Sequence, residues 1–256
     1  MILAIDMGNT NIVMGAIDDE KTYFVERVTT NHGKTDMEYA INIKSILEIH
    51  QLSPSQIEGA IVSSVVPPLN ATILSAVKKI CGFKPMLVGS GMKTGLNILM
   101  DNPKTVGSDM IVDAVAAIRD YPCPIIVIDM GTATTMSVVD ASGNYIGGVI
   151  LPGLKVSLDS LSGKTAQLPY ISLETPGSVI GKNTIDCMRS GILYGSAAMM
   201  DGIIDRMEKE LGATPSVVAT GGLANYILPL CRHEIAYEDD LLLKGLLILY
   251  NKNRRP

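Results

Sequence analysis

The sequence predicts an α/β protein made of two similar halves. Short apolar strands alternate with segments of helical periodicity, which is the pattern of an α/β fold. One strand ends in Asp6-Met7-Gly8, and another, Ile125–Ile128, ends in Asp129-Met130-Gly131. The two aspartates lie 129 − 6 = 123 positions apart in a chain of 256 residues, so each copy opens one half. A repeat of this size indicates a duplicated unit.

Both copies continue in the same way. After the first turn, Ile12–Ile17 is an apolar run that ends at the acidic residues 18–20. After the second turn, Met136–Val139 ends at the polar residues 140–144. Runs of β-branched and apolar residues bounded by polar turns are typical of strands. We therefore expect each half to begin with a β-hairpin whose turn carries an aspartate and a glycine.

The residues of these turns suit phosphate chemistry. Gly131 allows a turn that a Cβ would resist, and Thr132, Thr134 and Thr135 follow it as hydroxyl donors. A carboxylate repels a phosphate directly but can hold a cation beside it, while backbone N–H groups contact the phosphate oxygens. One such copy alone is equally consistent with an ordinary turn closing a hairpin. Because there are two copies, we expect one nucleotide to be clamped between two lobes.

Composition excludes several classes of protein. The hydrophobic fraction of 47% and mean hydropathy of +0.29 indicate a globular chain. A net charge of −5 argues against nucleic acid as a partner. The four cysteines and three histidines are scattered, which predicts neither a disulfide framework nor a zinc site. No apolar run is long enough to span a membrane, so we expect a soluble cytoplasmic protein.

The remaining elements follow from periodicity and from turn residues. Two of them have an expected cap: Asp36 for a helix to about residue 50, and Ser108 for a helix that ends before Tyr121-Pro122. The other expected strands are 23–28, 61–65, 84–88 and 217–219, and the other expected helices are 70–80, 184–211 and 241–250. The glycine-rich stretch 89–95 is expected to be a loop.

Two further positions are open to more than one interpretation. Asp109 falls in the first turn of its helix, where the helix dipole favours a carboxylate, so it is either a helix-start residue or a functional one. Thr220-Gly221-Gly222 ends a strand, and this turn suits contact with an adenosine or is simply tight.

Taken in order, the motifs resemble those of a known superfamily. Two Asp-x-Gly hairpins and a late Thr-Gly-Gly are similar to the acetate-kinase, sugar-kinase and actin superfamily. Within it, the whole chain resembles the type III pantothenate kinase family. The segments that carry this resemblance are 6–11 (DMGNTN), 64–67 (SVVP), 102–103 with 107–109 (NP and GSD), 129–135, 147–153 and 181–184. The resemblance implies two ribonuclease H-like (actin-like ATPase) lobes, residues 1–121 and 122–256, with ATP in the cleft between them.

The resemblance also implies a reaction and the residues that perform it. The family transfers the ATP γ-phosphate to pantothenate, the first step towards coenzyme A, and uses Mg²⁺ and a monovalent cation, K⁺ or NH₄⁺. Asp109 would be the general base, and Asp129 would hold the monovalent cation. The expected nucleotide-binding residues are Asp6, Met7, Gly8, Asn9, Thr10, Asn11, Ile12, Val13 and Thr132. The expected pantothenate-binding residues are Met100, Gly107, Ser108, Asp109, Met110 and Thr184, with Thr184 supplied by the partner in a homodimer.

Two positions depart from the family pattern. Met110 stands where the family usually has an arginine, and Met100 stands where it usually has an aromatic residue. Both belong to the acceptor pocket, so the departures predict weaker use of pantothenate or a different small acceptor. The alternative is a nucleotide-binding regulator that has kept the fold without turnover.

Overall fold

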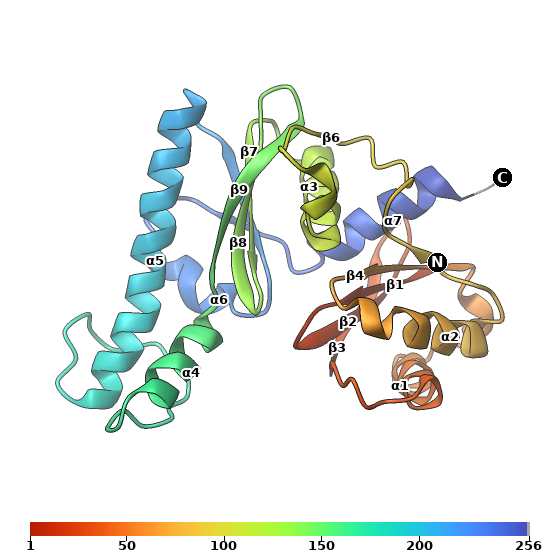
Figure 1. Ribbon diagram of the computed structural model, residues 1–256, viewed down its shortest axis with the longest axis horizontal. Coiled ribbons are helices and arrows are strands. Elements are labelled where there is room, and N and C mark those ends of the chain that lie inside the picture. Colours follow the sequence, from red (N-terminus) through yellow and green to blue (C-terminus); the bar gives the residue numbers. More distant parts are fainter. Residues whose placement is uncertain (255–256) are drawn as a thin grey trace. The chain divides into compact units, whose positions relative to one another are not determined.

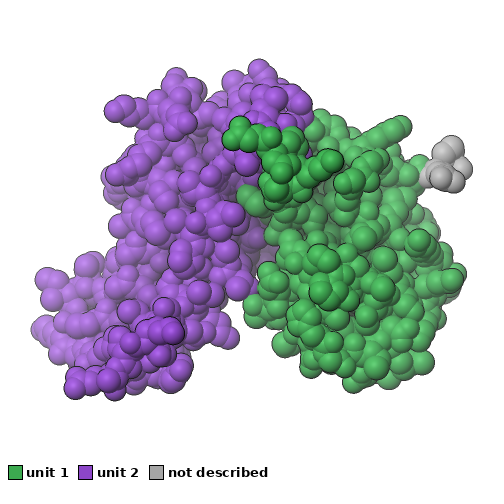
Figure 2. All heavy atoms as spheres, viewed as in Figure 1, with its two compact units in different colours: residues 1–96, 101–119, 240–256 green, residues 97–100, 120–239 purple. Residues whose placement is uncertain are grey.

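The computed structural model describes residues 1–254, which form two compact units (Figure 2). Unit 1 contains Met1–Leu96, Asp101–Arg119 and the segment from Asp240 onward, and unit 2 contains Asn97–Met100 and Asp120–Asp239. The main change of unit, at residues 119–120, lies within two residues of the expected boundary. The C-terminal segment differs from the expectation, because it belongs to unit 1.

Unit 1 is built on a five-stranded sheet of order β3–β2–β1–β4–β5. The strands are β1 (Ile2–Met7), β2 (Asn11–Ile17), β3 (Thr22–Thr29), β4 (Gly59–Ser64) and β5 (Met86–Leu87). β1, β2 and β3 pair antiparallel, whereas β4 pairs parallel with β1 and β5. The expected hairpin at the start of the chain is therefore present.

Helices cover both faces of this sheet (Figure 1). On one face, α1 (Asp36–Ile49) and α2 (Asn70–Cys81) pack with Leu3, Ile5 and Met7. On the other, α3 (Ser108–Asp120) and α7 (Leu241–Asn253) pack with Ile2 and Ala4. Successive side chains of a strand point to opposite faces, so Asp6 lies on the face that α3 and α7 cover.

The apolar face of α7 explains why the end of the chain belongs to unit 1. Leu243, Leu246 and Leu249 are buried in one cluster with residues of β1 and β4. Each fully buried leucine stabilises the fold by about 1.5–3 kcal/mol relative to an exposed one. Sequence order alone cannot reveal that this helix returns to the first sheet.

Unit 2 repeats the same strand plan. Its six-stranded sheet has the order β11–β10–β7–β8–β9–β6. The strands are β6 (Asn97–Ile98), β7 (Ile125–Met130), β8 (Ala133–Val139), β9 (Asn144–Pro152), β10 (Ser216–Thr220) and β11 (Ala236–Tyr237). As in unit 1, the first three strands of the repeat, β7, β8 and β9, pair antiparallel, and β10 pairs parallel with β7 and β11.

One face of the second sheet carries the core of unit 2. Ile126, Ile128 and Met130 pack there with three helices. These are α4 (Leu154–Lys164), α5 (Thr184–Leu211) and α6 (Ala224–Ile227), of which α5 is the longest helix in Figure 1. By strand parity, Asp129 points to the opposite face, with Ile125 and Val127.

Local details differ from the sequence predictions at several places. The cap of α1 is Thr35, not Asp36, because Thr35 forms a reciprocal capping box with Glu38. Ser108 is the first residue of α3, and its hydroxyl binds the end of β4 instead of capping the helix. The elements α4, β6 and β11 were not predicted. α4 follows Gly153, an N-cap residue that offers no side-chain hydrogen bond, and each of the two strands has only two residues.

Four short 3₁₀ turns complete the described chain, at Pro54–Gln56, Pro67–Leu69, Pro103–Thr105 and Leu228–Leu230. None of the helices within residues 1–254 has the length and apolar character needed to cross a bilayer.

Candidate active site

The first hairpin presents an exposed turn after Asp6. The Gly8 N–H donates to the Asn11 carbonyl at 3.0 Å, which closes the turn. Thr30, just beyond the end of β3, supports it, because its hydroxyl donates to the Gly8 carbonyl at 2.7 Å and its N–H donates to the Thr10 carbonyl at 2.9 Å. Asn9, Thr10 and Asn11 are exposed. The turn is thus held from behind while its polar groups face outward.

The start of α3 is fixed to the end of β4 by hydroxyl groups. Ser108 Oγ donates to the Ser64 carbonyl at 3.1 Å and accepts from the Ser64 N–H at 3.2 Å. It also lies 3.0 Å from the hydroxyl of Ser63, which is fully buried. Ser63 is the β4 partner of Asp6 in the parallel register. The start of α3 therefore lies beside Ser63, the residue that pairs with Asp6 on the neighbouring strand.

Asp109 occupies a space that Gly107 leaves open. A Cβ at Gly107 would lie 2.3 Å from Asp109 Oδ1, which is closer than any normal contact. The same oxygen accepts from the Met110 N–H at 2.8 Å. Burial raises the pKa of the Asp109 carboxyl, and the Met110 N–H opposes this shift. A carboxylate with a raised pKa is a better proton acceptor than an exposed one.

The second hairpin has the same register as the first but a shorter turn. In each hairpin, the aspartate lies four residue pairs after the first pair of the two strands. Asp6 pairs with Val13 in the first hairpin, and Asp129 pairs with Thr135 in the second. Its turn is closed by the Gly131 N–H, which donates to the Ala133 carbonyl at 3.0 Å. Thr132 at its tip is exposed, whereas Thr134 is buried. Of the threonines in this segment, Thr132 is thus the one accessible at the tip.

Hydroxyl residues flank Asp129 on both neighbouring strands. Thr135 of β8 and Thr220 of β10 are its partners in the two registers. Residues directly paired across strands place their side chains on the same face of the sheet. The second aspartate is therefore surrounded by oxygen-bearing side chains, whereas Asp6 has Val13 on one side and Ser63 on the other.

Two further glycines let backbone segments approach the second turn closely. A Cβ at Gly153, between β9 and α4, would lie 2.4 Å from the Thr132 carbonyl oxygen and 2.5 Å from that of Gly131. A Cβ at Gly221, after β10, would lie 2.6 Å from the Met130 carbonyl oxygen, and Gly221 also has a φ of +99°. Two backbone segments thus approach the second turn, at the end of β7, at positions where only glycine fits.

The predicted acceptor residues are divided between the units. Gly107, Ser108, Asp109 and Met110 lie together at the start of α3 in unit 1. Met100 belongs to unit 2 and lies beside β9. If Gly147 of β9 carried a Cβ, that atom would be 3.4 Å from the Met100 Sδ.

Thr184 also belongs to unit 2. It is the exposed first residue of α5, directly after the cap residue Asn183, whose Oδ1 accepts from the Asp186 N–H at 2.9 Å.

Sequence reasoning missed two contributors to this arrangement. Ser63 was not singled out, because a serine in an apolar strand has no distinctive spacing. Thr220 was noted only as part of a turn, and only the strand register reveals that it is adjacent to Asp129. The available signal is position: Ser63 is a hydroxyl residue at the end of an apolar strand and directly precedes the motif at 64–67.

The two units, each with its Asp-x-Gly hairpin, have the fold that is found in actin-like ATPases and sugar kinases. Solved structures agree: a Baf family transcriptional activator chain from Campylobacter jejuni has a TM-score of 0.61 at 17% identity and covers 98% of each chain. MreB 5 of Spiroplasma citri, bound to AMPPNP, has a TM-score of 0.55 at 10% identity, with 98% of this chain and 96% of that one covered. At these identities the likeness concerns the fold.

The family follows from the sequence comparisons. A sequence model of type III pantothenate kinase matches residues 2–206. The type III pantothenate kinase of Halalkalibacterium halodurans is 44% identical over 253 residues, covering 99% of this chain and 100% of that protein. The chain belongs to the type III pantothenate kinase family. The expected fold class and family are thereby confirmed.

Proposed function

We propose that this chain transfers the γ-phosphoryl group of ATP to the primary hydroxyl of pantothenate, with Asp109 as general base. The observation that carries this proposal is the placement of Asp109. Its carboxylate is partly buried, occupies the space that Gly107 leaves open, and belongs to the helix turn that Ser108 fixes beside Ser63, the strand partner of Asp6. The 44% identity to a type III pantothenate kinase over the full chain supports the same reaction.

The proton and phosphoryl transfers balance as follows. As the pantothenate oxygen attacks the γ-phosphorus, its proton passes to a carboxylate oxygen of Asp109. The bond between the γ-phosphorus and the bridging oxygen breaks, and ADP leaves with that oxygen. Phosphoryl transfer depends mainly on positioning and on neutralising charge, so no cysteine or histidine nucleophile is needed.

The chain's own groups suit the binding of ATP phosphates. Around the second turn, Gly131, Gly153 and Gly221 keep side chains away from the backbone, which leaves N–H groups and the Thr132 hydroxyl for phosphate oxygens. In the first hairpin, residues 6–13 present an exposed polar turn after a carboxylate. As a kinase family member, the chain uses ATP with a divalent metal, and bound Mg²⁺ would neutralise phosphate charge during transfer.

Asp129 is proposed to hold the monovalent cation, K⁺ or NH₄⁺. The support is its register between Thr135 and Thr220, which supply oxygen atoms on the same face of the sheet. Oxygen ligands are those that hard cations prefer. Asp6 lacks this pair of hydroxyl neighbours, and we assign it to the nucleotide.

Met110 and Met100 are proposed to set the affinity for the acceptor. Pantothenate carries a carboxylate, and neither methionine offers a charge to pair with it. Losing a hydrogen bond to a charged group typically costs about 1.5–3 kcal/mol, or roughly ten- to a hundredfold in binding. We therefore expect weak use of pantothenate by the wild-type chain.

We further propose a homodimer in which Thr184 completes the acceptor site of the partner. Apolar side chains around Thr184 are strongly exposed in the single chain: Ile180 by 81%, Val179 by 61% and Ile185 by 42%. A group of this kind is typical of a protein–protein contact. Light scattering should give twice the 27.3 kDa chain mass, and Ile180→Asp should shift it towards the monomer. A wild-type monomer at micromolar concentration would refute this assignment.

The kinase is favoured over the regulator because full-length relatives carry the kinase name. The decisive experiment is formation of 4′-phosphopantothenate from Mg-ATP and pantothenate in the presence of K⁺. Asp109→Asn should abolish it and leave ATP binding intact. Equal turnover by this variant and the wild type would refute the proposal.

A further inference from the structure

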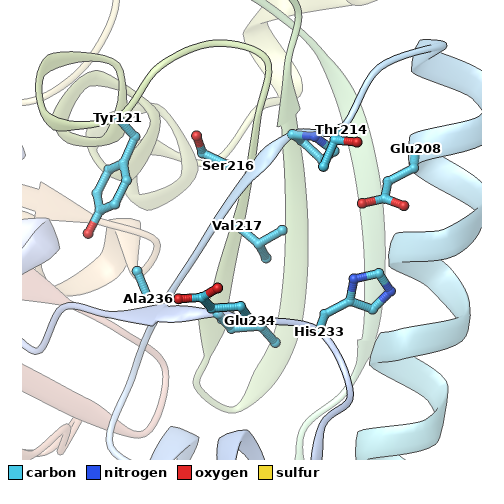
Figure 3. Close-up of a pocket in the computed structure, with 10 residues that line it drawn as sticks. Tyr121, Glu208, Thr214, Ser216, Val217, His233, Glu234 and Ala236 are labelled. Atoms are coloured by element: carbon cyan, nitrogen blue, oxygen red, sulfur yellow. The ribbon is translucent and has the colours of Figure 1, made fainter.

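Unit 2 contains a pocket at the end of its sheet opposite to the second hairpin. The pocket has a volume of about 420 Å³ and is lined by residues that include Ser216 and Val217, the first residues of β10 (Figure 3). Thr220, the partner of Asp129, ends the same strand. At about 3.3 Å per residue, the two ends of β10 are roughly 13 Å apart. The pocket is therefore separate from the proposed phosphate-binding turn.

Three side chains with metal-binding groups converge beside this pocket. His233 and Glu208 line it, and their side chains point toward one another from the 231–235 segment and from α5 (Figure 3). Asp205, one helical turn before Glu208, is the third member. One ligand atom from each of these residues lies within 4.8 Å of the other two. The set combines an imidazole with two carboxylates, so it is more than a group of acidic residues.

A buried carboxylate holds the histidine in this position. Asp201 is only 2% exposed and accepts hydrogen bonds from the Arg232 N–H at 2.9 Å and from the His233 N–H at 3.1 Å. Asp201, Asp205 and Glu208 recur at the i, i+4, i+7 spacing of one helix face. The backbone at His233 is thus fixed to the same face of α5 that carries the two carboxylates. Metal sites depend on such support of their ligands.

The contacts of Asp205 leave one of its oxygens for an ion. Its Oδ2 pairs with Arg232 at 3.1 Å, and its Oδ1 lies 2.8 Å from His233 Nε2. A metal ion can replace this second contact without disturbing the first. Ligands about 2.0–2.2 Å from a tetrahedral ion are roughly 3.4 Å apart, so a pair separated by the full 4.8 Å must approach by about 1.4 Å. A rotation of the long Glu208 side chain supplies it.

We propose that Asp205, Glu208 and His233 bind a divalent transition-metal ion of the zinc class, with a fourth coordination position for water. Imidazole nitrogen and carboxylate oxygen are the donors that zinc takes in sites with three protein ligands and an open position. The ion connects α5 with the segment that leads into β11, and therefore stabilises unit 2. The spacing in sequence did not predict the site, because His233 follows Glu208 only after 233 − 208 = 25 positions.

The test is equilibrium dialysis of the full chain against Zn²⁺ in excess Mg²⁺, followed by melting curves with and without zinc. The wild type should bind one zinc ion per chain and melt at a higher temperature in its presence. His233→Ala and Glu208→Gln should each weaken zinc binding by about tenfold or more. The Glu208 carboxylate makes no hydrogen bond or ion pair within the described residues, so the folding of Glu208→Gln should be unaffected. The matched control is Glu210→Gln, an exposed residue of the same helix, which should bind zinc like the wild type.

Two outcomes would overturn the proposal. One is binding of less than one equivalent by the wild type at micromolar Zn²⁺. The other is zinc binding that survives both His233→Ala and Glu208→Gln but is lost in Cys187→Ser, since Cys187 is an exposed free thiol. That result would assign the metal to an exposed cysteine.

Discussion

The two hairpins have the same strand register and the same aspartate position, yet their surroundings differ. Asp6 lies between Val13 and Ser63, whereas Asp129 lies between Thr135 and Thr220. The first turn spans residues 8–11 between paired positions, and the second spans only 131–133. Duplication has preserved the backbone plan, because the register fixes which residues face the core. The side chains paired with the two aspartates differ between the hairpins even where they are buried, as Ser63 and Thr220 are.

The divergence separates two kinds of chemistry. Unit 1 adds α3, which places a partly buried carboxylate, Asp109, one residue after Ser108, and Ser108 contacts the strand partner of Asp6. Unit 2 adds glycine turns at Gly153 and Gly221 that approach the backbone of the second hairpin. In our proposal, the proton acceptor therefore belongs to unit 1 and the cation to unit 2. The predictions below test this division.

The largest expected effect is the loss of the base in unit 1. Asp109→Asn keeps the size of the side chain but removes proton-accepting ability, which is typically worth 10²–10⁴ in rate. We expect kcat for pantothenate to fall by about that factor while the dissociation constant of Mg-ATP stays within about twofold. Rapid-quench kinetics and calorimetric titration measure the two quantities. Asp159→Asn, an exposed aspartate of unit 2, is the control and should be unchanged.

The next effect tests the glycine turns of unit 2. In Gly221→Ala, the new Cβ would meet the Met130 backbone at 2.6–2.8 Å, so the backbone must shift. Overpacking of this kind typically costs about 1–3 kcal/mol, or roughly ten- to a hundredfold if it appears in nucleotide affinity. Calorimetry with Mg-ATP should show weaker binding. The control is Gly177→Ala, whose new Cβ meets no atom within 4 Å, so this variant should bind Mg-ATP as the wild type does. If the two variants bind Mg-ATP with equal affinity, the turn at Gly221 is not part of the nucleotide site.

A smaller gain is expected when a charge is restored at the start of α3. Met110→Arg supplies a cation that can pair with the acceptor carboxylate. The expected result is an increase of about tenfold in kcat/KM for pantothenate at saturating Mg-ATP, since a charge-assisted hydrogen bond contributes about 1.5 kcal/mol or more. Met110→Leu should gain nothing. If the arginine variant also gains nothing, residue 110 does not contact the acceptor.

The smallest effect concerns stability. Burial raises the pKa of Asp109 in the folded chain, so folding favours its protonated form. The folded state then binds more protons than the unfolded state, and stability falls as pH rises from the ordinary pKa of an aspartate through the raised one. At neutral pH, Asp109→Asn should therefore melt above the wild type, and the difference should shrink below the ordinary pKa. Calorimetric melting at both pH values checks this sign; a variant that melts lower at neutral pH contradicts it.

Much of the fold was predictable because its signals are local. The strands of both hairpins follow from apolar runs that end at Asp6 and Asp129, and the long helix α5 was expected to end at Leu211. The return of α7 to unit 1 was not predictable, because hydrophobicity shows that a helix is buried but not against what. The same limit applies to Ser63 and Thr220. Their importance depends on register across strands distant in sequence, and no spacing reveals it.

The most direct test of the division between units is the dependence of kcat on K⁺ in two matched variants. Asp6→Asn and Asp129→Asn change the corresponding residue of each hairpin in the same way. K⁺ would be exchanged for Na⁺ at constant ionic strength with saturating Mg-ATP. We predict that Asp129→Asn loses the K⁺ activation seen in the wild type, whereas Asp6→Asn retains it and loses Mg-ATP affinity. Loss of K⁺ activation in Asp6→Asn alone, or an equal loss in both variants, would contradict the assignment of the cation to unit 2.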